Sequence, residues 1–150
     1  SGIKKTTAKE SALTLINQFG LTNFEKAWPS QLSGGMRQRL ALLRTFLMPQ
    51  QLLLLDEPFG ALDAITRRSM QEWLQEVWEK DKRTVLLVTH DVEEALILSD
   101  IVYVMKPRPG SIIFELNVEY PRPRRSNIVT TMDFVTAKAR LLEALGNSKS

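Results

Sequence analysis

Apolar residues at helical spacing divide the chain into several predicted helices. Met36, Leu40, Leu43 and Leu47 recur at intervals of four, three and four residues, so they share one face of a helix that Pro49 ends. The same periodicity predicts helices over 8–19, 65–79, 92–98 and 132–145.

Short apolar runs between these helices predict strands over 52–55, 84–88 and 101–105, with a further strand over 112–118 that returns in antiparallel fashion. The run 52–55 is entirely leucine and is typical of a strand buried on both faces. Strands that alternate with helices connect through right-handed crossovers. The sequence therefore predicts the α/β class, with a largely parallel sheet flanked by helices.

Composition and charge exclude several classes of protein. The chain has 150 residues, a net charge of +3 and no cysteine, which fits one domain in a reducing compartment, by default the cytoplasm. Its apolar runs are far shorter than the roughly 20 residues of a membrane helix. The densest basic cluster, Arg122, Arg124 and Arg125, is interleaved with prolines, so we interpret it as a solvated loop and expect no nucleic-acid partner.

Two adjacent carboxylates, Asp56 and Glu57, follow the leucine strand. The carboxyl ends of strands are where ligands bind in open α/β sheets. One carboxylate there can hold Mg²⁺ while the next orients a water that attacks a phosphate. The alternative is that Asp56-Glu57-Pro58 only caps the strand and opens a turn.

Three further segments carry candidate chemistry. Ser33, Gly34 and Gly35 open a predicted helix, where backbone N–H groups favour an anion, although Ser33 is also an ordinary N-cap. His90, the sole histidine, follows the strand 84–88 and is either a structural residue or a phosphate contact. The segment 60–63 reads as a turn that ends on the acid of the next helix.

In their order along the chain, the four segments resemble the motifs of ABC-transporter ATP-binding subunits, and the resemblance covers about residues 9–120. The signature matches Leu32, Ser33, Gly34, Gly35 and Met36, the Walker B strand ends at Asp56, the catalytic glutamate is Glu57, the D-loop is Gly60, Ala61, Leu62 and Asp63, and the switch histidine is His90. Met36 stands where many members of the family have glutamine.

The resemblance implies a P-loop NTPase-like layered fold, incomplete at its N-terminal side, over residues 1–120, followed by a linker and helix over 121–150. It implies a head-to-tail dimer in which the signature serves the ATP of a second ATP-binding subunit. Asp56 would then hold Mg²⁺ through a bound water, Glu57 would polarise the attacking water, and His90 would contact the γ-phosphate. Asp63 would lie at the dimer seam.

The runs 33–39, 59–64 and 108–124 resemble the importer branch for nitrate, sulfonates and taurine. That branch implies a transmembrane permease as partner, a solute-binding protein acting indirectly, and a place at the inner face of the cell membrane. None of the seven glycines begins a Gly-Lys-Ser/Thr phosphate cradle, so we expect the chain alone to be inactive. The alternatives are a non-catalytic dimerisation or regulatory module and a soluble ABC ATPase of repair or translation, although no sustained heptads support the repair type.

Overall fold

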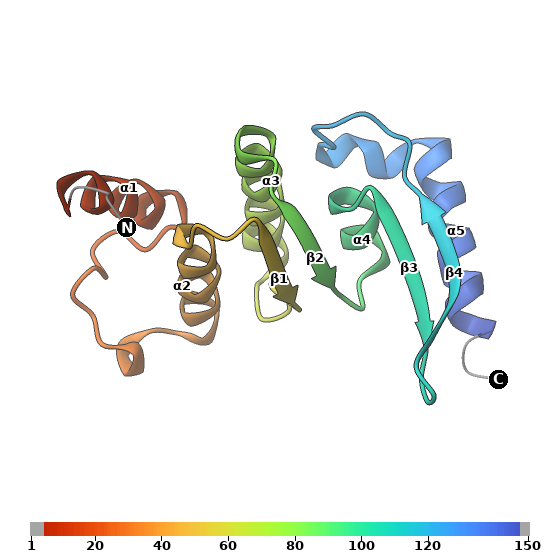
Figure 1. Ribbon diagram of the computed structural model, residues 1–150, viewed down its shortest axis with the longest axis horizontal. Helices are drawn as coiled ribbons and strands as arrows, with labels where there is room; N and C mark the ends of the chain where they lie inside the picture. Colours follow the sequence, from red (N-terminus) through yellow and green to blue (C-terminus); the bar gives the residue numbers. More distant parts are fainter. Residues whose placement is uncertain (1–4, 148–150) are drawn as a thin grey trace.

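The computed structural model describes residues 5–147 and has an elongated arrangement in which helices and strands follow one another along the long axis (Figure 1). In chain order the elements are α1 (Lys5–Gln18), η1 (Pro29–Gln31), α2 (Gly34–Leu47), β1 (Leu52–Asp56), α3 (Ala64–Asp81), β2 (Thr84–Val88), α4 (Val92–Leu98), β3 (Ile101–Lys106), β4 (Ser111–Asn117), η2 (Ser126–Thr130) and α5 (Met132–Asn147). All the predicted helices and strands are present, with ends that differ by a few residues. The α/β class is confirmed.

Strands β1 and β2 pair in parallel, with Leu52 opposite Thr84 and Asp56 opposite Val88, and α3 forms the connection between them. The prediction that the leucine strand is buried on both faces is wrong. Leu53 and Leu55 lie in the core, whereas Leu52 and Leu54 are half exposed or more. Alternate side chains of a strand point to opposite faces, and α2 and α3 supply core residues to only one face of β1.

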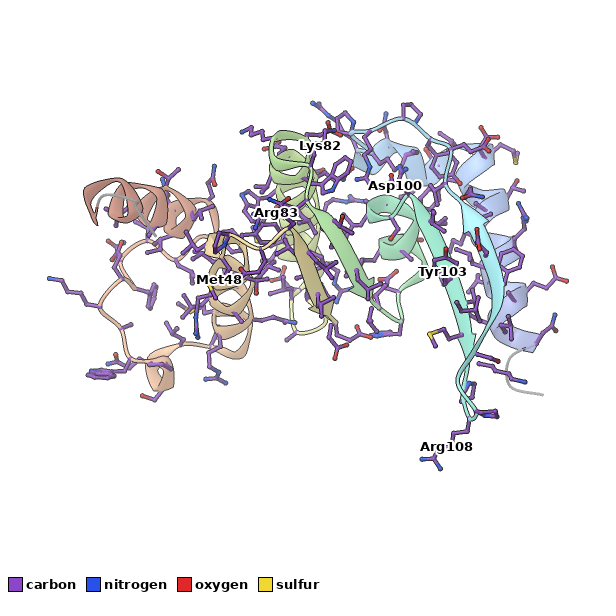
Figure 2. The ribbon with its side chains drawn as sticks, viewed as in Figure 1. Met48, Lys82, Arg83, Asp100, Tyr103 and Arg108 are labelled. Atoms are coloured by element: carbon purple, nitrogen blue, oxygen red, sulfur yellow. The ribbon has the colours of Figure 1, made fainter. Side chains whose placement is uncertain are left out.

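The first core joins α1, α2, β1 and α3. The Trp73 ring of α3 meets Phe19 and Phe46 edge-on, with centroids 4.2 and 5.0 Å away. Arg83, immediately before β2, donates to the backbone oxygens of Phe46 and Met48 at the end of α2 (Figure 2). These bonds satisfy two of the carbonyls at the end of α2, where the last carbonyls have no partner within the helix.

The second core lies between the β3–β4 hairpin and α5, with Phe134 and Leu141 of α5 fully buried. The antiparallel return of β4 onto β3 is confirmed. The expectation that β3 extends the parallel sheet is not met, because β2 pairs only with β1 and β3 only with β4 among the described residues.

An apolar groove of about 950 Å³ lies between β2 and β3. Its lining includes Leu86 and Val88 from β2, and Tyr103 and Met105 from β3, all about half exposed or more. Among the described residues, each of the two sheets presents an unpaired strand edge and apolar side chains to this groove. No helix in the described part of the chain has the length and apolarity needed to cross a membrane.

Arg124 is buried, not solvated as expected for the arginine cluster. Its guanidinium donates to the backbone oxygens of Leu96, Ser99, Val118 and Tyr120. A buried guanidinium needs such partners because it cannot lose its charge.

The backbone of Arg124 is also held by α3. Gln75 accepts from its N–H at 2.7 Å and donates to its carbonyl at 2.9 Å. The arginine therefore fastens the chain after β4 to both α3 and α4, and α3 joins the two cores.

Candidate functional site

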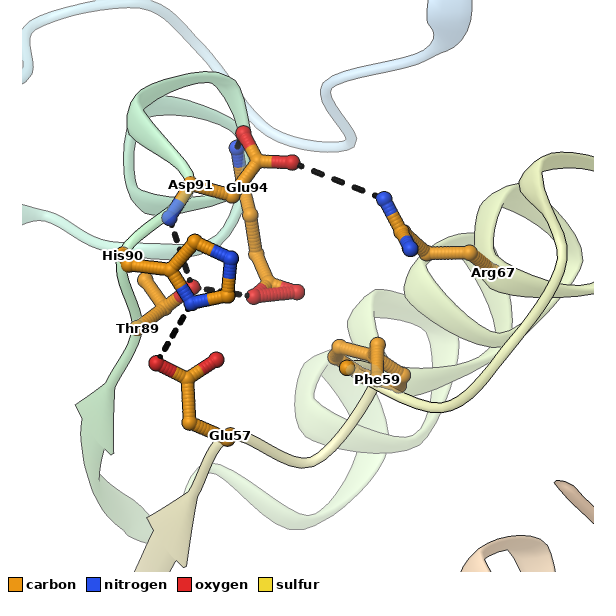
Figure 3. Close-up of a pocket in the computed structure, with 8 residues that line it drawn as sticks. Glu57, Phe59, Arg67, Thr89, His90, Asp91 and Glu94 are labelled. Carbon is orange, nitrogen blue, oxygen red and sulfur yellow. Dashed lines mark hydrogen bonds and ion pairs between the residues drawn. The ribbon is translucent and has the colours of Figure 1, made fainter. Parts of the chain in front are cut away.

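Glu57 and His90 converge at the carboxyl ends of β1 and β2. The parallel register places Asp56 beside Val88, so the residues that follow each strand leave the sheet at the same edge. His90 Nδ1 lies 2.7 Å from Glu57 Oε1, and Figure 3 shows the imidazole directly above the carboxylate. An ionised carboxylate can only accept, so Nδ1 is the donor and carries the proton.

This contact shifts the pKa of the histidine. The hydrogen bond to Glu57, and next the charge of the same carboxylate, raise the pKa of His90 above its ordinary value. The His90 side chain is 81% exposed, so solvent screens the pair. The contact therefore orients the ring more than it stabilises the fold.

The backbone of Glu57 adopts an uncommon conformation. Its φ of 45° lies in the left-handed region, where residues other than glycine are disfavoured. Its N–H donates to Val88 O at 2.9 Å, and its carbonyl accepts from Gly60 N at 3.2 Å and from Gln38 Nε2 at 2.7 Å. Three hydrogen bonds thus hold the turn that aims the Glu57 side chain at His90.

The segment 60–63 leads directly into α3. Asp63 is the N-cap of this helix, and its carboxylate accepts from the backbone N–H groups of Ile65 and Thr66. The hydrogen bond with the Thr66 side chain, and next the bond with the Thr66 backbone, lower the pKa of the Asp63 carboxyl. The N-cap reading of Asp63 is confirmed, and its place at a dimer seam stays a prediction.

The segment Ser33-Gly34-Gly35 forms the start of α2. Ser33 accepts from Met36 N at 3.2 Å, so the N-cap reading is confirmed. A side chain at Gly34 would meet open space, and a Cβ at Gly35 would lie 3.6 Å from Ala61 O. The first turn of α2 therefore packs against segment 60–63 while its tip faces solvent. Met36 is half buried and packs on the first core.

A small pocket of about 30 Å³ lies beside the Glu57–His90 pair, with room for a water molecule. Its lining is Glu57, Phe59, Gly60, Arg67, Thr89, His90, Asp91 and Glu94 (Figure 3). Of the residues expected at the site, it brings together Glu57, Gly60 and His90. Asp56 and Ser33 through Met36 are not among its lining residues.

Glu94 is a member of this site that the sequence analysis missed. It is 3% exposed, accepts from Thr89 Oγ1 at 2.7 Å and from Gln71 Nε2 at 3.4 Å, and burial raises its pKa. Arg67, also missed, donates to Leu62 O at 3.0 Å and lies 3.8 Å from the Asp91 carboxylate. For Glu94, which lies in the first turn of the helix predicted over 92–98, the sequence gave one signal, since a carboxyl on the inward face of a helix needs a partner.

The residues at this edge fit Mg²⁺ only with help from other ligands. Asp56 is exposed at the end of β1, and no group of three or more His, Cys, Asp or Glu side chains within residues 5–147 is arranged to hold a metal ion. Mg²⁺ commonly takes one or two carboxylates and completes its shell with waters and substrate phosphates. Asp56 suits such a site.

Comparison with known proteins agrees with this geometry. Residues 2–60 match the ABC transporter family profile. The formylaminopyrimidine import ATP-binding protein ThiZ of Halalkalibacterium halodurans is 49% identical over 130 residues, which cover 87% of this chain and 51% of that protein. The aliphatic sulfonates import ATP-binding protein SsuB 1 of Rhodococcus jostii is 55% identical over 116 residues, 77% of this chain and 46% of that protein. The chain spans about half the length of the curated relatives it matches.

Solved structures show the same architecture. The chain superposes on the dimeric ABC transporter cassette MJ0796 with a TM-score of 0.69 and 29% identity, over 81% of this chain and 51% of that one. A second structure of that cassette, in a post-hydrolysis state bound to ADP and Pi, gives a TM-score of 0.68 and 27% identity, over 81% and 51% of the two chains. The motif order, the meeting of two of the motifs at one sheet edge and these similarities agree, and the chain belongs to the family of ABC transporter ATP-binding proteins.

Proposed function

We propose that this chain is part of the ATP-hydrolysing subunit of an ABC importer. The observation that carries the proposal is the 2.7 Å contact between Glu57 and His90 beside a pocket with room for a water. A carboxylate next to a bound water can orient it and take its proton, and a histidine donor nearby can stabilise charge on a phosphate. Such positioning and electrostatics are most of what phosphoryl transfer requires.

Within this proposal each motif has one role. Glu57 and His90 are the catalytic residues, and Asp56 helps to hold Mg²⁺ with the nucleotide and waters. Leu32, Ser33, Gly34, Gly35 and Met36 bind the ATP of a second ATP-binding subunit. The exposure of Ser33 and Gly34 at the N-terminus of α2 supports this, because free N–H groups there favour an anion. Gly60 through Asp63 couple the two sites.

The importer assignment rests on the names of the relatives, which import aliphatic sulfonates or formylaminopyrimidine. The Bacillus subtilis sulfonate protein SsuB is 42% identical over 93% of this chain. We infer a small organic or inorganic solute, a transmembrane permease and, indirectly, a solute-binding protein as partners. The subunit would then lie at the cytoplasmic side of the membrane, docked on the permease.

The chain by itself is expected to hydrolyse no ATP, since it contains no Gly-Lys-Ser/Thr cradle for the β- and γ-phosphates. The test compares Mg²⁺-dependent ATP hydrolysis by the purified chain and by the chain joined to an upstream P-loop segment of the family. Activity only in the joined protein, lost in Glu57→Gln, supports the proposal. Turnover by the chain alone would contradict the expected inactivity.

The second candidate is a non-catalytic ABC-derived module for dimerisation or regulation. By themselves these 150 residues hold no phosphate cradle and would act only in this way, whereas the Glu57–His90 contact favours a catalytic parent protein. If the joined protein binds ATP yet hydrolyses none, and Glu57→Gln leaves it unchanged, the non-catalytic reading replaces the first.

A further inference from the structure

One side chain, Gln38, connects the start of α2 to the turn that carries Glu57. Its Nε2 donates to Glu57 O at 2.7 Å, and its Oε1 accepts from Ala61 N at 2.9 Å. The amide therefore spans the turn between Glu57 and segment 60–63 with both of its polar ends. Both distances are those of well-formed hydrogen bonds.

The turn needs such support. Glu57 has a φ of 45°, which a non-glycine residue keeps only when its surroundings hold it there. Within the turn only Gly60 N also donates to Glu57 O, at a longer 3.2 Å. Gln38 thus supplies the shorter of the two bonds on the carbonyl of the residue whose side chain must reach His90.

Gln38 also occupies a special place on α2. It lies three residues after Gly35, and residues three apart face the same side of a helix. Gly35 packs against Ala61 and Leu62. A Cβ added at Gly35 would lie 3.6 Å from Ala61 O and 3.5 Å from Leu62 Cδ2. A single face of α2 therefore contacts both ends of the turn.

We propose that Gln38 is a positioning residue that fixes the Glu57 backbone and so holds the Glu57 carboxylate within reach of His90, linking the signature helix α2 to the catalytic pair of its own chain. The assignment of that pair rests on the proposed function, whereas the contact itself does not. A shift of α2 would move Gln38, and with it the turn, because the amide bonds both ends.

The sole histidine of the chain makes a direct test possible. In the 150-residue chain labelled with ¹⁵N-histidine, NMR reports the tautomer and titration midpoint of His90. Gln38→Leu removes both hydrogen bonds, so the turn relaxes, Glu57 leaves His90, and the midpoint falls toward the ordinary histidine value. The matched control is Arg44→Gln, an exposed position on the same helix, which should leave the midpoint unchanged.

Circular dichroism and the amide spectrum show whether each variant is folded. A folded Gln38→Leu with an unchanged midpoint and tautomer would overturn the proposal. Should that variant not fold, Gln38→Met keeps the length of the side chain and is judged by the same criterion. In the unaltered chain, the Ala61 N–H and the Gln38 side-chain amide must exchange slowly with solvent, and fast exchange of both would also overturn it.

These measurements use no nucleotide. A failure of ATP hydrolysis therefore leaves the role of Gln38 standing, and an unaltered His90 in folded Gln38 variants leaves the proposed ATPase function standing. The two conclusions can fail separately.

Discussion

His90 Nδ1 and Glu57 Oε1 lie 2.7 Å apart although 33 positions separate the two residues in the chain. The parallel pairing of β1 and β2 creates this contact, because it brings the ends of both strands to one edge. The turn at Glu57 then aims the carboxylate at the imidazole. The pair is consequently a sensitive reporter of how the site is assembled.

Glu57→Gln should lower the pKa of His90. The wild-type pKa is raised first by the hydrogen bond and then by the charge of Glu57, and the amide removes the charge. A histidine whose pKa is raised by folding stabilises the fold at acidic pH and loses that effect as pH rises through the raised value. NMR titration of His90 checks the prediction, and equal midpoints in both proteins would contradict it.

Glu94→Gln should make stability less sensitive to pH. Burial raises the pKa of Glu94, so the folded chain binds more protons than the unfolded chain, and stability falls as pH rises from the unfolded pKa through the folded one. The glutamine keeps the shape and cannot ionise. Urea unfolding at a series of pH values measures the free energy of unfolding of both proteins. The same dependence on pH in Glu94→Gln and in the unaltered chain would rule the effect out.

Glu94→Ala is the harsher companion variant. It leaves Thr89 and Gln71 without their shared partner, so we expect a loss of about 1–3 kcal/mol in the free energy of unfolding. A loss in Glu94→Gln as large as that in Glu94→Ala would mean that the charge, not the hydrogen-bonded shape, matters at this position.

Arg124→Ala should destabilise the chain strongly. The change strips four backbone carbonyls of their donor, and unsatisfied buried acceptors cost about 1–3 kcal/mol each before any rearrangement. The stability of Arg124→Lys should lie between that of Arg124→Ala and that of the unaltered chain, because one ammonium cannot reach as many acceptors as the planar guanidinium. The exposed neighbour gives the control, and Arg125→Ala should stay within about 0.5 kcal/mol. Urea unfolding compares the three variants. If Arg124→Ala were as stable as Arg125→Ala, the Arg124 side chain would not hold the chain after β4 in place.

The apolar groove between β2 and β3 should make the isolated chain self-associate. Unpaired strand edges and contiguous exposed apolar side chains favour such contacts. The double variant Leu86→Lys, Met105→Lys places charges in the groove and should shift the chain toward monomer in sedimentation velocity. Ile65→Lys, 82% exposed on α3 and outside the groove, is the control. A wild-type chain that stays monomeric at all concentrations would contradict the prediction.

The local pattern of the sequence predicted the elements well. Helical spacing from Met36 to Leu47 and the leucine run before Asp56 depend on neighbouring residues only, so both elements are present near their predicted bounds. The edge shared by Glu57 and His90 was also predictable, since each follows a strand of a parallel pair. Roles in ATP binding, metal binding and coupling remain predictions.

Tertiary structure alone decided the rest. Gln38 meets Glu57 and Ala61 across 19 and 23 positions, and Gln75 meets Arg124 across 49. No periodicity encodes such pairs, because they depend on how separate elements pack. The same reason explains the uncovered face of β1 and the burial of Arg124: the sequence by itself determined which residues form helices, strands and motifs, whereas their burial and partners were set only when the elements met in space.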